Sequence, residues 1–189
     1  LGPTILILGF AALTPAHAQP PSTSAVITNY ADIAAANFAD SHAAAVEMQK
    51  KIEDLLANPS DEALATARAA WVAAREPYMQ TEVYRFGNKL VDDWEGKVNA
   101  WPLDEGLIDY VSRTYSEADT QENEGYAINV IANKSLKIAG ETIDASNITP
   151  QLLVRHLHEA GGVEANVATG YHAVEFLLWG QDLNGTGKG

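Results

Sequence analysis

Apolar residues recur every three or four positions along most of this chain, which is the spacing of one face of an α-helix. Residues 26–56 are rich in Ala, Ile and Leu, contain neither Gly nor Pro, and are predicted to form one long helix. Asn58-Pro59 then predicts the end of this helix. Ser60 is the expected N-cap of the next helix, with Asp61 and Glu62 at the positive end of its dipole.

The second predicted helix runs from Asp61 to about Phe86. Pro77 lies inside it and predicts a kink or break near Glu76, because proline lacks a backbone donor and crowds the preceding turn. Residues 87–149 have a mixed pattern. From it we predict a short helix over residues 104–115 and a polar loop over residues 116–125.

Two more helices are predicted beyond residue 149. Thr149 is the expected N-cap and Pro150 the first residue of a helix over residues 151–160, which Gly161-Gly162 closes. The last helix covers residues 163–179 and stops at Gly180. No segment alternates at strand spacing, so the sequence predicts an all-α fold without a substantial sheet, arranged as an antiparallel helical bundle.

The first residues of the sequence are apolar or small, apart from Thr4 and Thr14, and lead into Pro15-Ala16-His17-Ala18. This is the apolar run and cleavage site of a secretory signal peptide without its basic start. The alternative is a membrane anchor, but a span needs about 20 apolar residues and this run is shorter. We therefore expect a mature protein that begins near Gln19, lies in the periplasm or cell envelope, and has no stable membrane insertion after signal cleavage.

The expected organisation has three parts: a signal peptide over residues 1–18, a helical domain over residues 19–183, and a glycine-rich linker over residues 184–189 that leads into further protein. The net charge of the chain limits the classes of partner that it can bind. The formal net charge is −13 and the first basic residue is Lys50, so we expect no nucleic-acid partner. Cysteine is absent, so any metal must bind His, Asp or Glu.

His172 and Glu175 are the strongest candidates for chemistry. They stand one turn apart in a helix otherwise built from Val, Phe, Leu and Trp, so an imidazole nitrogen and a carboxylate could converge on one cation. Two polar groups buried in an apolar helix need a partner. The alternative is a partly buried histidine paired with a neighbouring acid.

A second group of candidates lies on the predicted helix before residue 86. On a regular helix, five side chains would project within about 40° of one line; they are Trp71, Arg75, Tyr78, Glu82 and Arg85. Glu82 could supply a further oxygen ligand and Arg75 could orient a carboxylate, unless this is a half-exposed face joined by i, i+4 pairs. Asp104 is a further supporting candidate, although helix capping is the favoured explanation for Asp104 and Glu105.

The segment Gly170-Tyr171-His172-Ala173-Val174-Glu175, followed by Phe-Leu-Leu-Trp-Gly-Gln-Asp, resembles the Gly-x-His-x-x-Glu signature of the imelysin-like family, also called peptidase M75. Residues 71–78, 80–82 and 99–104 resemble family segments in the same order. The resemblance implies an exported protein of two helical-bundle domains with a site between them near this motif. This chain would then hold the first bundle and lack the C-terminal half.

The family includes iron-regulated proteins, iron-uptake components and a member described as an insulin-cleaving metallopeptidase, so three functions stay open. The first is binding of a divalent or trivalent metal ion, iron before zinc because carboxylates with one imidazole suit iron, in iron uptake with other envelope proteins as partners. The second is a metallopeptidase, which we place after binding because Glu175, if a ligand, leaves no evident base. The third is a metal-free helical interaction module.

Overall fold

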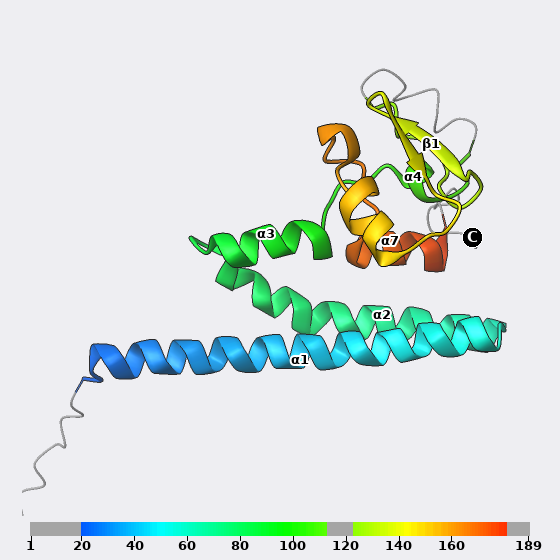
Figure 1. The fold of residues 1–189 in the computed structure, drawn as a ribbon. Helices are drawn as coiled ribbons and strands as arrows, with labels where there is room; N and C mark the ends of the chain where they lie inside the picture. The colour runs from blue at the N-terminus through cyan, green and yellow to red at the C-terminus, as the bar shows by residue number, and fades with distance from the viewer. Residues whose placement is uncertain (1–19, 113–122, 181–189) are drawn as a thin grey trace, which may run out of the picture.

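The computed structural model describes residues 20–112 and 123–180. The predicted signal peptide and the predicted linker fall on residues outside these ranges, as does most of the predicted loop over residues 116–125. Helix α1 (Thr23–Ala57) and helix α2 (Asp61–Thr81) form an antiparallel hairpin (Figure 1). Ser60 caps α2 as predicted, because its hydroxyl accepts a hydrogen bond from the Ala63 amide at 3.1 Å.

Helix α2 continues through Pro77 and ends at Thr81, so the break predicted near Glu76 is absent. The chain then tightens into the 3₁₀ turn η1 (Glu82–Arg85), where the prediction had α-helix up to Phe86. Helix α3 (Lys89–Val98) follows, in a region for which the sequence had suggested no helix. Of the predicted helix over residues 104–115, the described residues up to 112 contain the single turn α4 (Glu105–Ile108), and residues 113–115 lie outside the described ranges.

The described part of the chain contains one small sheet, an antiparallel hairpin of β1 (Ser135–Ile138) and β2 (Glu141–Asp144), in which Leu136 pairs with Ile143. The all-α class is confirmed with this addition. A short helical segment follows, made of α6 (Pro150–Leu152) and the π-helical turn η2 (Leu153–Leu157), with Thr149 as the predicted N-cap. The 3₁₀ turn η3 (Ala160–Gly162) closes it.

The last helix is shorter than predicted. Helix α7 covers Gly170–Trp179, and residues 163–169 are irregular. The cause lies at Asn166, which is fully buried and donates its side-chain amide to the Ala160 carbonyl at 2.7 Å, while its backbone carbonyl accepts from the Glu159 amide. A loop fixed by these bonds cannot also make helical ones.

Buried side chains form three clusters, two of which include residues of α7. One holds the α1–α2 hairpin to α7, with Ala74, Tyr78 and Tyr171 at its centre. A second joins α4 to α7 through Ile108, Ala173 and Phe176. The third lies under the β1–β2 hairpin and α6. It is made of Leu107, Val130, Leu136, Ile138, Ile143, Ala145, Leu152, Leu157, Ala160 and Ala168. Helix α7 is therefore the element on which the two parts of the fold meet.

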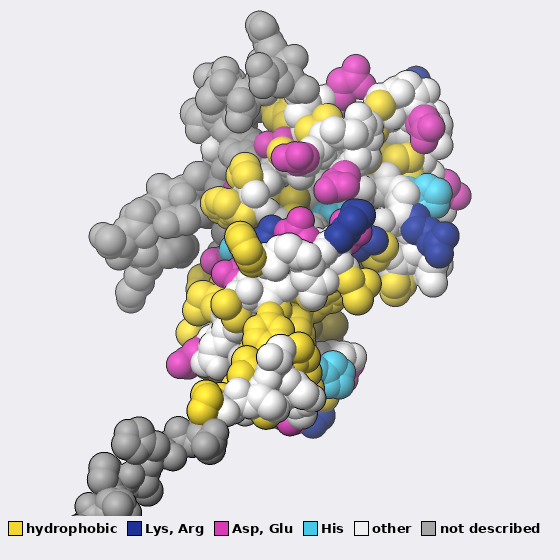
Figure 2. Space-filling model, turned by 90° about the vertical axis from the view of Figure 1, so that its left-hand side faces the viewer, with side chains coloured by type: hydrophobic (Ala, Val, Ile, Leu, Met, Phe, Trp, Pro, Cys, Tyr) yellow, Lys and Arg dark blue, Asp and Glu magenta, His cyan; other side chains and the backbone are white. Residues whose placement is uncertain are grey.

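The end of the molecule formed by the N-terminal half of α1, by η1 and by the start of α3 is unusually apolar. Tyr30 is 57% exposed, Phe86 is 98% exposed and Leu90 is 82% exposed. Figure 2 shows hydrophobic side chains gathered at this end. Within the described ranges, no helix combines the length and the apolar character needed to cross a bilayer.

Candidate metal site

The position of α7 is fixed at its first residue. Gly170 has φ +87°, a region that L-residues with a side chain rarely adopt, and a Cβ atom there would overlap the backbone carbonyl of Val98 at the end of α3. The hydroxyl of Thr169 also donates to the Lys97 carbonyl at 2.8 Å. The glycine before the His172 turn is thus required for α7 to start against α3.

Helix α2 holds α7 through its backbone. The indole N–H of Trp71 donates to the Tyr171 carbonyl at 2.9 Å, and Nε of Arg68 donates to the Leu178 carbonyl at 2.9 Å. The guanidinium of Arg75 lies 5.0 Å from the centroid of the Tyr171 ring. Because a guanidinium over a ring face is held by the ring quadrupole, Arg75 ties the two helices together as well.

His172 and Glu175 form a direct pair on α7. Nδ1 of His172 lies 2.9 Å from Oε2 of Glu175, and the His172 ring contacts the Trp101 ring with centroids 4.9 Å apart and planes tilted by 52°. The side chain of His172 is 17% exposed and that of Glu175 is 42% exposed. Among the described residues, Nε2 of His172 has no hydrogen-bond partner. A histidine whose Nδ1 is held by a carboxylate presents Nε2 in a fixed direction, as metal-binding histidines commonly do.

Glu105, at the start of α4, is an acid near this pair. From the sequence, helix capping was the favoured explanation for it. Its pKa is raised above the ordinary value, first by burial and then by the negative charge of Glu175. The two carboxylates therefore act on each other across the packed α4 and α7. The acid pair Asp104-Glu105 is visible in the sequence, but contact between α4 and α7 depends on the tertiary fold.

Glu82 and Arg75, also predicted for the site, belong to a different polar cluster centred on Asn99. The Asn99 amide donates to Glu82 at 3.3 Å and to Glu95 at 3.2 Å, and its carbonyl oxygen accepts from Arg75 at 2.5 Å. In the described part of the chain, no hydrogen bond or ion pair joins Glu82 to His172 or Glu175. The structure thus leaves Glu82 and Arg75 apart from the α7 pair.

Asp104 is the N-cap residue of α4, but its side chain makes no capping hydrogen bond. Its carboxylate instead accepts a hydrogen bond from the amide of Asn123, which also donates to Asn166 at 2.8 Å. The Asp104 backbone amide donates to the Ala165 carbonyl at 2.8 Å. The observed contacts of Asp104 thus connect α4 to the loop before α7.

Residues 34–189 match the imelysin family, peptidase M75. The chain belongs to the imelysin family. It is also 26% identical over 107 residues to iron-regulated protein A of Synechococcus elongatus, an alignment that covers 53% of this chain and 30% of that protein. The matched part is thus less than a third of the length of this relative.

The matched region of this imelysin-family chain includes α7 with His172 and Glu175. Over the described ranges, no group of three or more His, Asp or Glu side chains is placed to surround a metal ion. The donors that the α7 pair offers are an imidazole nitrogen and a half-exposed carboxylate. They can share one ion only if the ion replaces the hydrogen bond between Nδ1 and Oε2, because Nε2 points to another side of the ring. Two such donors fit a metal ion as part of a ligand set and would need further ligands to complete it.

Proposed function

We propose that this protein is an exported cell-envelope protein of the imelysin family that binds a metal ion, iron before zinc, through His172 and Glu175 and serves iron acquisition. The observation that carries the proposal is the His172–Glu175 pair, with Nδ1 held at 2.9 Å by the carboxylate and Nε2 unpartnered within the described residues. The name of the Synechococcus relative, iron-regulated protein A, supports the choice of iron.

The chemistry of the pair suits a cation. A neutral imidazole offers one nitrogen lone pair, and a carboxylate at i+3 on the same helix face adds oxygen donors. The side chains of Glu105 and Glu175 interact electrostatically, and a cation between or beside them would relieve the repulsion of two carboxylates. We extend the proposal to Glu105 as a second oxygen ligand after Glu175. The Glu105 side chain would have to move towards the pair, because the three side chains do not surround an ion as they stand. Glu82 is the alternative.

The test is metal retention by the full-length protein. After incubation with Fe²⁺, Fe³⁺ or Zn²⁺ and dialysis, elemental analysis should find metal on the wild type and about 10- to 100-fold weaker binding in His172→Ala and in Glu175→Ala. Two exposed residues that make no hydrogen bond or ion pair with other described residues provide matched controls, His156→Ala for the imidazole and Glu76→Ala for the carboxylate. Both controls should bind like the wild type.

Two results would contradict the proposal. One is wild-type metal content in a folded His172→Ala, Glu175→Ala double variant. The other is unfolding of that double variant in the absence of metal, since it would assign the pair a structural role. For the ligand set, Glu105→Gln should weaken binding and Glu82→Gln should not; the opposite order would restore Glu82 to the site.

Export is tested separately. The apolar run and Pro15-Ala16-His17-Ala18 support a signal peptide over residues 1–18. N-terminal sequencing of protein recovered from the periplasmic fraction should therefore begin close to Gln19. Recovery of the chain with its apolar run intact would contradict the cleaved signal.

A further inference from the structure

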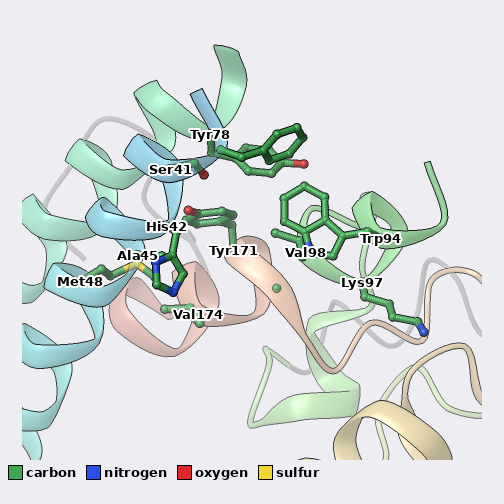
Figure 3. Close-up of a pocket in the computed structure, with 12 residues that line it drawn as sticks. Ser41, His42, Ala45, Met48, Tyr78, Trp94, Lys97, Val98, Tyr171 and Val174 are labelled. Carbon is green, nitrogen blue, oxygen red and sulfur yellow. The ribbon is translucent and has the colours of Figure 1, made fainter. Parts of the chain in front are cut away.

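A pocket of about 370 Å³ lies between α1, α2, α3 and α7 (Figure 3). Its walls are largely aromatic: the ring of Tyr78 lies 5.0 Å from that of Tyr171 and 5.9 Å from that of Trp94, measured between centroids. Phe38 stands 5.8 Å from Trp94. A volume in this range and an aromatic lining are typical of sites for small molecules.

Helix α7 separates this pocket from the proposed metal site. Tyr171 and Val174 line the pocket, whereas the neighbouring His172 and Glu175 do not. Successive residues of a helix project about 100° apart, so the two pairs occupy different faces of α7. A ligand in the pocket would therefore leave the His172–Glu175 pair in place, and the two sites can be tested independently.

The charge around the pocket is unlike that of the chain as a whole. The chain has 25 acidic and 12 basic residues, yet no Asp or Glu of the described ranges lines the pocket. Apart from the tyrosines, the ionisable side chains among its described lining residues are His42, on the α1 side, and Lys97, on the α3 side, and both are exposed (Figure 3). Lys97 forms no ion pair within the described residues, so its ammonium group is available to a ligand.

The two ends of the pocket differ in their electrostatics. The hydroxyl of Tyr78 is buried without a hydrogen-bond partner in the described residues, and burial with the charges of Glu95 and Glu82 outweighs the opposite effect of Arg75 and Arg85 on it. Negative charge is thus disfavoured at this end. Figure 3 places Tyr78 at the top of the view and Lys97 towards the bottom, with its side chain extending away from the rings. An anionic group is consequently favoured at the mouth and an apolar body inside.

We propose that this pocket binds a small aromatic monocarboxylate, with its ring between Trp94 and Tyr171 and its carboxylate at the mouth towards Lys97. Ring faces on several sides favour a flat aromatic body, which can stack or meet edges. Donors at the mouth, with no acceptor carboxylate among the lining residues, favour an acid over an amine.

The test uses the full-length protein and three probes of one shape, 2-naphthoate, 2-naphthamide and 2-naphthylmethylammonium, titrated by calorimetry. 2-Naphthoate should bind about three- to five-fold more tightly than the amide, because one exposed ion pair contributes at most about 1 kcal/mol. The ammonium probe should bind most weakly. The preference for naphthoate should shrink as salt is raised, since the contact at the mouth is exposed to solvent.

Two pairs of variants locate the site. Ala45→Phe fills the pocket from α1 and should abolish binding, whereas Ala43→Phe adds the same ring at an exposed position of the same helix and should not. Lys97→Gln should remove the preference for naphthoate over the amide. Lys137→Gln makes the same charge change on β1, away from the pocket, and should retain the preference.

A fluorescence measurement covers the case in which Ala45→Phe fails to fold. Binding of 2-naphthoate should change the tryptophan emission of the wild type and of Trp179→Phe, and the change should be lost in Trp94→Phe. The proposal is overturned if naphthoate shows no saturable binding, if a folded Ala45→Phe binds like the wild type, or if the emission change survives in Trp94→Phe. Equal affinity for all three probes would overturn the assignment of an acid.

Discussion

The backbone carbonyl of Val98 occupies the space that a Cβ atom would need at Gly170, so the first residue of α7 has room for a hydrogen atom alone. The same glycine has φ +87°. Steric room and backbone conformation are thus two separate requirements for glycine at this position. The close contact between Gly170 and Val98 holds the end of α3 against the helix that carries His172 and Glu175.

Alanine substitutions can separate these two requirements. Gly170→Ala should lower the free energy of unfolding by about 3 kcal/mol or more, because it meets both the backbone strain and the Val98 carbonyl. Gly87 has φ +69° with nothing within 4 Å of its Cβ position, so Gly87→Ala should show the strain alone, about 1 kcal/mol. Denaturant unfolding measures both, and equal losses would contradict the steric role of Val98.

The sequence predicted the helical hairpin well because its determinants are local. Ser60, the acids that follow it and the apolar repeat of α1 and α2 act within a few residues of one another, and the structure keeps them. The family resemblance was also predicted and is confirmed by the match over residues 34–189. The predicted start of α7 was wrong because buried contacts of Asn166 keep residues 163–169 from forming a helix. The spacing of apolar residues does not reveal these contacts.

The candidate site was predicted in part for the same reason. His172 and Glu175 meet because i, i+3 geometry within one helix brings them together. Placing Glu82 with them assumed a regular α-helix up to Arg85. In the structure the chain tightens into a 3₁₀ turn at Glu82, and the Asn99 amide donates a hydrogen bond to the Glu82 carboxylate. Glu105 was not included because its approach to Glu175 depends on how α4 packs on α7.

Tyr78 and Tyr171 should respond in opposite ways to loss of their hydroxyl groups. The Tyr78 hydroxyl is buried without a partner in the described residues, so Tyr78→Phe should leave stability unchanged or raise it by up to about 1 kcal/mol. The Tyr171 hydroxyl donates to the Ala74 carbonyl at 3.4 Å, so Tyr171→Phe should lower stability by about 1 kcal/mol. Thermal and denaturant unfolding of both variants checks the signs, and a larger loss in Tyr78→Phe would refute the prediction.

Tyr78 also predicts how stability changes at alkaline pH. Its pKa is raised above the ordinary value of 10.0, first by burial and then by Glu95 and Glu82. Between the ordinary and the raised value, the unfolded chain loses this proton while the folded chain keeps it. The unfolded state then binds fewer protons, so the free energy of unfolding falls as pH rises above 10. Urea unfolding from pH 8 to 11 should show this fall, and Tyr78→Phe should reduce its slope; an unchanged slope would contradict the assignment.

The buried amide of Asn166 is the last contact whose importance can be measured. Asn166 is fully buried, accepts from the Asn123 amide at 2.8 Å and donates to the Ala160 carbonyl at 2.7 Å. Asn166→Ala removes both bonds and leaves Asn123 and Ala160 with unsatisfied groups, so the free energy of unfolding should fall by about 2–4 kcal/mol. Asn133→Ala provides the control, since its amide also binds carbonyls, at 2.8 and 3.2 Å, but from an exposed position. It should cost about 1 kcal/mol or less. A loss at Asn166 no larger than that at Asn133 would show that the loop before α7 does not depend on this amide.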